Sequence, residues 1–256
     1  MQLSGQPHAK VASLDTRQLR DLPMPPVNAR AESRNELDTM VVNVELTLSS
    51  IIQGVALSFL AENAREVLNV GHARAWPYVY TGLIVILLFW VRSLIHTLTL
   101  MRWPLELGHN CLYFLCALVE VLAFTRLADP EKWFALLALF ALCVWAVFIY
   151  DLRVIRSRMH DSAGPHGSEL YGIVLRDQWL NIRFIVPALF LFNAAAATSI
   201  HTAPEFFVER DGHLIFIIAE AIGISVYLGV VIHGFTKITP LVAATREDWR
   251  AKLPNE

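Results

Sequence analysis

The second long apolar stretch of the chain carries two ionisable side chains that could do chemistry inside a membrane. In ILLFWVRSLIHTLTLMRWP, residues 86–104, Arg92 and His96 are four residues apart and therefore share one face of a helix. His109 follows after a short turn, and Glu45 lies at a matching depth in the first apolar stretch. We expect one polar layer, with Glu45 as the partner of Arg92. Such a layer could bind an anion, gate a pore or relay protons; the alternative is a structural ion pair between helices.

A second polar layer is predicted in the other half of the membrane. The third apolar stretch places Glu120 on the same helix face as Asn110 and Tyr113. Glu220 lies at a similar depth in the last apolar stretch, and neither stretch contains Lys or Arg. The two carboxyl groups could therefore share a cation or a proton, as in a transport path. Alternatively, each is neutral or bonds to a hydroxyl or amide group on a neighbouring helix.

Two uncharged polar residues complete the set of candidates. Gln53 lies four residues after Ser49, among small residues that favour either close helix packing or a pore lining. Asn193 lies near mid-membrane beyond Pro187, which should kink its helix or free a carbonyl group. The candidate transport or gating residues are Glu45, Gln53, Arg92, His96, His109, Glu120, Asn193 and Glu220.

The sequence offers little for a catalytic or metal centre. His96 and His109 are one candidate pair for a bis-His haem, but such a site needs histidines that face each other across a bundle, so haem is disfavoured. The three cysteines lie in apolar runs without a CxxC spacing, and no ExxH, GxSxG or HExxH motif occurs inside an apolar stretch. We predict no catalytic residue and no metal ligand, and leave the cofactor open.

The elements that must position these residues are six apolar stretches. The chain is 55% hydrophobic and only 17% charged, with a mean hydropathy of +0.46, which is typical of membrane proteins. A spanning helix needs about 20 apolar residues. The predicted spans are 41–61, 77–100, 105–125, 133–150, 184–200 and 213–235. We therefore predict an all-α, polytopic membrane protein with its six helices in one bundle, over residues 41–236.

The distribution of Lys and Arg predicts the orientation of these spans. If the N-terminus is inside, 15 of the 21 basic residues fall on the inner side and 5 on the outer side. Cytoplasmic segments carry such an excess, so we predict cytoplasmic termini in the cell inner membrane. Residues 1–40 are expected to form a cytoplasmic arm, 151–183 a cytoplasmic connection and 237–256 a tail. Within the connection, residues after Ser168 form either a short amphipathic helix or the start of a longer fifth helix.

These patterns favour one class of function and leave two others open. The leading interpretation is a channel or transporter for an ion or small solute, with a homo-oligomer or other membrane-complex partners in the lipid bilayer. The alternatives are a non-catalytic membrane subunit or signalling scaffold, and a haem redox protein. The net charge of −2 argues against nucleic acid as a partner, since nucleic-acid binding requires a clustered basic surface.

Overall fold

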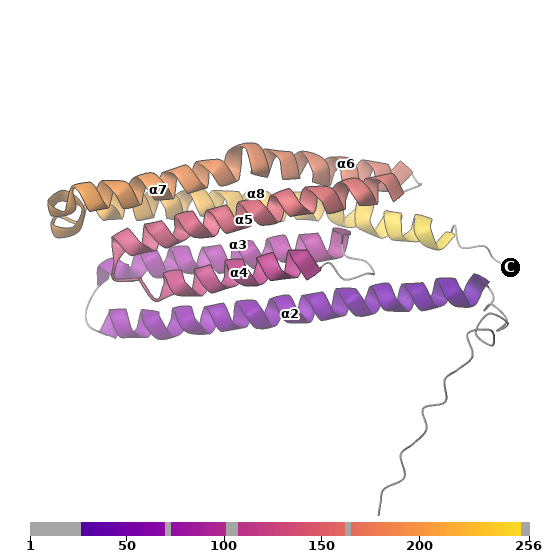
Figure 1. Cartoon of the computed structure of the whole chain (residues 1–256), viewed down its shortest axis with the longest axis horizontal. Coiled ribbons are helices and arrows are strands. Elements are labelled where there is room, and N and C mark those ends of the chain that lie inside the picture. Colours follow the sequence, from indigo (N-terminus) through magenta and orange to yellow (C-terminus); the bar gives the residue numbers. More distant parts are fainter. Residues whose placement is uncertain (1–26, 70–72, 101–106, 162–164, 252–256) are drawn as a thin grey trace, which may run out of the picture.

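The computed structural model describes residues 27–69, 73–100, 107–161 and 165–251, and the elements in these ranges are helical. In chain order they are α2 (Val27–Asn69), η1 (Ala73–Ala75), α3 (Trp76–Leu100), α4 (Leu107–Phe124), α5 (Pro130–Asp161), α6 (Pro165–Leu180), the π-helical turn η2 (Asn181–Ile185), α7 (Val186–Thr202), the π-helical turn η3 (Glu205–Glu209) and α8 (His213–Ala251). Figure 1 shows the long helices lying side by side in one bundle. The predicted all-α fold is confirmed.

Six stretches of helix are long and apolar enough to cross a membrane. They are Glu36–Val67, Trp76–Leu100, Leu107–Phe124, Pro130–Met159, His166–Thr202 and His213–Thr245. Helix is the expected state of such segments because lipid offers no partner for backbone N–H and C=O groups, which must pair within the segment. The chain therefore has the architecture of a multi-pass membrane protein. The cytoplasmic placement of its termini stays a prediction.

The helices extend well beyond the predicted spans. The fourth helix, α5, was predicted to end at Tyr150 and continues to Asp161, while α6, η2 and α7 follow one another without a break. Residues 151–183 are thus helical on both sides of a short segment at 162–164, and the longer fifth helix is the alternative that the structure adopts. Residues 1–26 of the predicted arm and 252–256 of the predicted tail lie outside the described residues.

The fifth span is irregular where Pro187 requires it. Proline has no N–H to donate, and its ring would clash with the carbonyl group four residues earlier, that of Arg183. Arg183 lies within η2, whose wider turn removes the conflict while the helix continues. The side-chain amide of Asn181 donates to the carbonyl oxygen of Asp177 at 2.7 Å and so satisfies an acceptor next to the turn.

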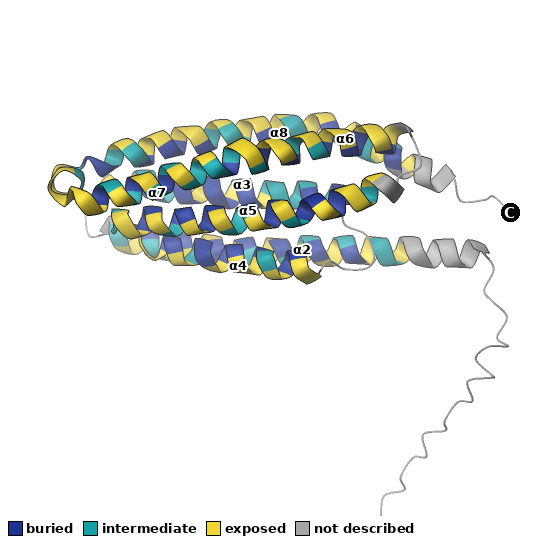
Figure 2. Ribbon diagram, turned by 45° about the horizontal axis from the view of Figure 1, so that its top comes forward, coloured by how far each residue is buried: buried dark blue, intermediate teal, exposed yellow. Residues whose placement is uncertain are grey.

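Aromatic packing defines the core near one end of the bundle. The Tyr78 ring meets Trp133 edge-on, with 5.5 Å between ring centroids, and Phe134 at 6.3 Å. The outer faces of the helices instead expose large apolar side chains, such as Ile215 and Ile222 of α8 (Figure 2). In water such an apolar surface would be unfavourable, so these faces are the ones that contact lipid.

Candidate functional site

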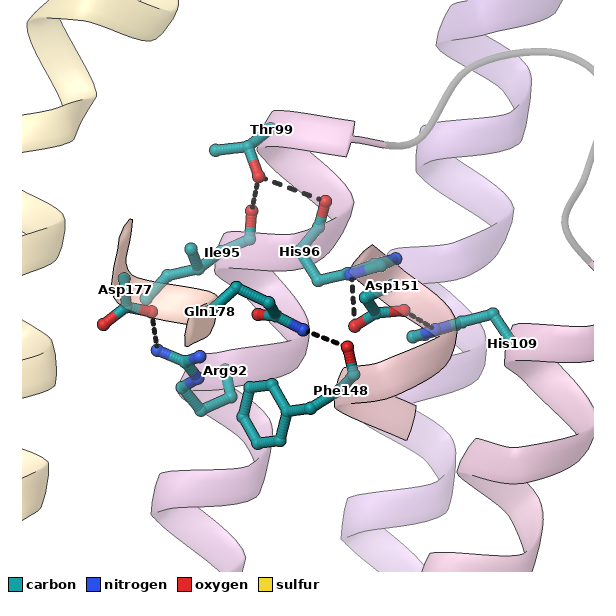
Figure 3. Close-up of polar contacts among 9 residues, drawn as sticks. All are labelled: Arg92, Ile95, His96, Thr99, His109, Phe148, Asp151, Asp177 and Gln178. Carbon is teal, nitrogen blue, oxygen red and sulfur yellow. Dashed lines mark hydrogen bonds and ion pairs between the residues drawn. The ribbon is translucent and has the colours of Figure 1, made fainter. Parts of the chain in front are cut away.

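Three helices bring two histidines and one aspartate together inside the bundle. Nδ1 of His109 on α4 lies 2.8 Å from Oδ1 of Asp151 on α5, and Nδ1 of His96 on α3 lies 3.1 Å from Oδ2 of the same carboxylate. The two imidazole rings stack with 4.0 Å between centroids and 6° between planes. All three residues are buried. We call this group the His–Asp cluster; Figure 3 shows both histidines directed at the one carboxylate.

Arg92 has a different partner from the one predicted. Its Nη1 donates to Oδ2 of Asp177 on α6 at 2.7 Å, and its guanidinium group lies over the Phe148 ring, 4.9 Å from the centroid (Figure 3). The prediction that Glu45 pairs with Arg92 is therefore wrong. The physical reason is that the helix of the fifth span begins earlier than predicted, so that α6 brings the carboxylate of Asp177 to Arg92. The Arg92 side chain is 16% exposed and that of Asp177 43%.

Glu45 belongs to a separate polar contact between α2 and α4. Its Oε1 accepts a hydrogen bond from the side-chain amide of Asn110 at 2.7 Å, and both residues are buried. One turn further along α2, the hydroxyl group of Ser49 lies 2.8 Å from that of Tyr113 and 2.5 Å from that of Ser93. These hydroxyl groups connect α2, α3 and α4 at the level of the His–Asp cluster.

Further along the bundle, the next polar residues are Gln53 on α2 and Glu120 on α4. The Gln53 side-chain amide donates to the Tyr113 hydroxyl at 3.3 Å. Glu120 is fully buried, and neither of its carboxyl oxygens has a hydrogen-bond partner within the described residues. Gln53 and Glu120 thus lie on the α2–α4 side of the bundle, where the predicted face of Asn110, Tyr113 and Glu120 is indeed buried.

Glu220 lies on the opposite side of the bundle, with Asn193. The Asn193 side-chain amide donates to Oε1 of Glu220 at 2.8 Å, and both side chains are buried. The hydrogen-bond partner of Glu220 is thus Asn193 of α7. The shared-cation hypothesis for Glu120 and Glu220 stays a prediction. The structure supports the alternative for Glu220, a hydrogen bond to an amide group on a neighbouring helix.

A cavity of about 490 Å³ connects two of these polar groups. Its walls come from α3, α5, α7 and α8, together with parts of α4, α6 and η2, and are mainly apolar. The His–Asp cluster, Arg92 and Asp177 line one part of it, and Asn193 and Glu220 line another. Glu45, Gln53 and Glu120 are not among its lining residues. Five of the eight predicted candidates, His96 and His109 included, therefore face one internal space.

Sequence reasoning missed the two aspartates of this site. Asp151 and Asp177 both fall in the segment predicted to be a cytoplasmic connection. For Asp151 a signal exists, since it continues the helical spacing of Val144, Val147 and Phe148, which also line the cavity. Asp177 carries no comparable signal, because only the packing of α6 against α5 and α8 places its side chain at Arg92.

The arrangement of the histidines bears on which groups could bind there. Axial haem ligands direct one nitrogen each at the iron from opposite faces of the porphyrin. Rings stacked face to face at 4.0 Å cannot hold an iron and a porphyrin between them in this way. By contrast, one ligand atom from each of His96, His109 and Asp151 can be chosen so that all lie within 4.8 Å of one another, close enough for a single metal ion.

Comparison of the chain with protein-family models, with curated proteins and with solved structures gave no match.

Proposed function

We propose that this protein is a membrane transporter or channel that moves protons, alone or together with a small solute, through the cavity between α3, α5, α7 and α8. The observation that carries the proposal is the extent of that cavity. Its lining residues on α3 run from Val85 to Leu100. At about 1.5 Å per residue, this separation is about 22 Å, or about three quarters of the thickness of a bilayer's hydrocarbon core of about 30 Å.

The chemistry of the lining residues favours protons as the transported or coupled ion. The polar groups along the cavity include three carboxyl groups and two imidazoles, which can gain or lose a proton, together with two amides, four hydroxyl groups and one guanidinium group. Ionisable side chains within membrane spans are unfavourable unless they pair or line a path, and the carboxyl groups of this cavity pair with Arg92, with the two histidines or with Asn193. The apolar remainder of the wall suits a solute with an apolar body and a polar end.

The setting of this transport is part of the proposal. We place the protein in the cell inner membrane with cytoplasmic termini, following the excess of basic residues on one side of the spans. Association into a homo-oligomer or with other membrane proteins would also fit the exposed apolar helix faces.

A pair of matched variants tests the proposal. Glu220→Gln and Glu120→Gln each replace a buried carboxyl group by an amide in an apolar span, but only Glu220 lines the cavity. Purified protein is reconstituted into liposomes that contain a pH-sensitive dye, and a potassium gradient with valinomycin drives protons inward. We expect wild type and Glu120→Gln to acidify the lumen faster than empty liposomes, and Glu220→Gln to do so much more slowly.

The same experiment separates transport from the scaffold alternative. A scaffold would leave proton flux at the level of empty liposomes in wild type and both variants. Equal flux through wild type and Glu220→Gln would also contradict the proposed path, since the amide cannot take up and release the proton. Thermal unfolding of each sample in detergent confirms that any difference in flux comes from folded protein.

A further inference from the structure

The His–Asp cluster has the composition and spacing of a transition-metal site. Its donors are two imidazole nitrogens and a carboxylate, which come from α3, α4 and α5. In a tetrahedral zinc site, bonds of about 2.0–2.1 Å place neighbouring donor atoms about 3.3 Å apart. The observed distances from Asp151 oxygens to the two Nδ1 atoms are 2.8 and 3.1 Å. The two imidazole rings, which lie 6° from parallel, would have to turn so that both Nδ1 lone pairs point at the ion.

The charges around the cluster favour a divalent cation. Arg92 is the guanidinium cation of this layer, and Asp177 already pairs with it. Asp151 and Glu45 are the further carboxylates here, and their contacts within the described residues are with histidines and with the Asn110 amide rather than with Lys or Arg. A divalent ion in the cluster would therefore be attracted by carboxylates that no Lys or Arg of the described residues pairs with.

The surroundings leave a position for a fourth ligand. All three residues of the cluster line the cavity, so an ion between them would face it on one side. Nε2 of His96 is buried and has no hydrogen-bond partner within the described part of the chain. Within these residues, no hydrogen bond to this second ring nitrogen therefore holds the His96 ring in its present orientation.

We propose that His96, His109 and Asp151 form a binding site for one divalent transition-metal ion, with a fourth coordination position open to the cavity. Imidazole and carboxylate donors suit zinc and similar first-row metals, whereas calcium and magnesium prefer sites made of oxygen ligands alone. Three protein ligands with one open position are the arrangement of catalytic and exchangeable zinc sites, since structural sites are closed by four. This inference does not depend on the transport proposal.

Metal binding by the purified full chain tests the inference. The protein is prepared in detergent with a tag that contains no histidine, treated with EDTA, and titrated with zinc chloride by calorimetry and with cobalt(II) chloride by visible absorption. We expect one ion per chain and the d–d bands of a four- or five-coordinate cobalt ion. His96→Ala, His109→Ala and Asp151→Asn should each weaken zinc binding by about 100-fold or more, because each removes one of three ligands.

His201→Ala is the matched control, because His201 is exposed and pairs with Glu131 rather than with the cluster. It should bind zinc as wild type does. The inference is overturned if wild type binds no zinc, or if His96→Ala and Asp151→Asn bind it as tightly as wild type. If a variant fails to fold, the unfolding temperature of the wild-type protein tests zinc binding by itself. Zinc should raise this temperature and EDTA should reverse the increase, whereas magnesium should have no effect.

Discussion

Filling the cavity from α8 tests directly whether solute passes through it. Gly223 lines the cavity, and a Cβ atom built on it meets no atom within 4 Å. The substitution Gly223→Leu therefore adds four carbon atoms beside the cavity, beginning from a Cβ position that is free of neighbours. It also replaces a glycine inside a helix, which by itself should stabilise α8 by roughly 0.5–1 kcal/mol.

We expect Gly223→Leu to slow transport, because the leucine would crowd a solute in the cavity. The empty protein accommodates the leucine, whereas a protein with solute in the cavity must hold both. Overpacking of a filled site costs about 1–3 kcal/mol. Since about 1.4 kcal/mol corresponds to a tenfold change, occupancy and flux should fall by about 5- to 150-fold.

Proteoliposomes with an enclosed pH-sensitive dye measure this flux. Gly229→Leu is the control on the same helix: its Cβ position is equally free of neighbours, but Gly229 does not line the cavity. It should conduct as wild type does. Both variants should unfold in detergent at or above the temperature of wild type.

Two outcomes would refute the reasoning. If Gly223→Leu and Gly229→Leu both conduct like wild type, solute does not pass the cavity at Gly223. If both variants lose flux to the same degree, the effect comes from the helix rather than from the space that the first leucine fills.

Two further predictions concern the stability of the bundle. Gly82→Ala should destabilise the bundle by about 1–3 kcal/mol, because the new Cβ would lie 3.0 Å from Leu60 Cδ1 in the core. The control Gly54→Ala places its Cβ in open space and should be neutral or stabilising. Equal unfolding temperatures for the two variants would contradict this prediction. Tyr113→Phe should lower the free energy of unfolding by about 0.5–1.5 kcal/mol, because it removes the hydroxyl group bonded to Ser49. A double-mutant cycle with Ser49→Ala should give a coupling energy of about 0.6 kcal/mol. Strictly additive effects would show that this hydrogen bond contributes nothing to stability.

Much of the architecture follows from local properties of the sequence. Length and hydropathy are enough to find six spans, since lipid leaves a backbone no choice but helix. The short turn after the second span is enough to expect His96 and His109 at one level, and their rings do stack. The spacing of Asn110, Tyr113 and Glu120 likewise predicts a single face, and all three are buried.

Helix ends were harder to predict than helix positions. Hydropathy falls at Asp151 because polar residues follow it, so the apolar run ends there although the helix does not. A helix needs only paired backbone groups and one buried face to continue. That continuation, through α5 and α6, carries Asp151 and Asp177 into the site.

The sequence by itself determined that this chain is a helical membrane protein and that ionisable groups lie within its spans, because hydropathy and helical period depend only on neighbouring residues. The tertiary structure alone decided the partners of those groups. Arg92 pairs with Asp177, Glu45 bonds to Asn110 and Glu220 bonds to Asn193, because the packing of one helix against another selects which buried faces come into contact.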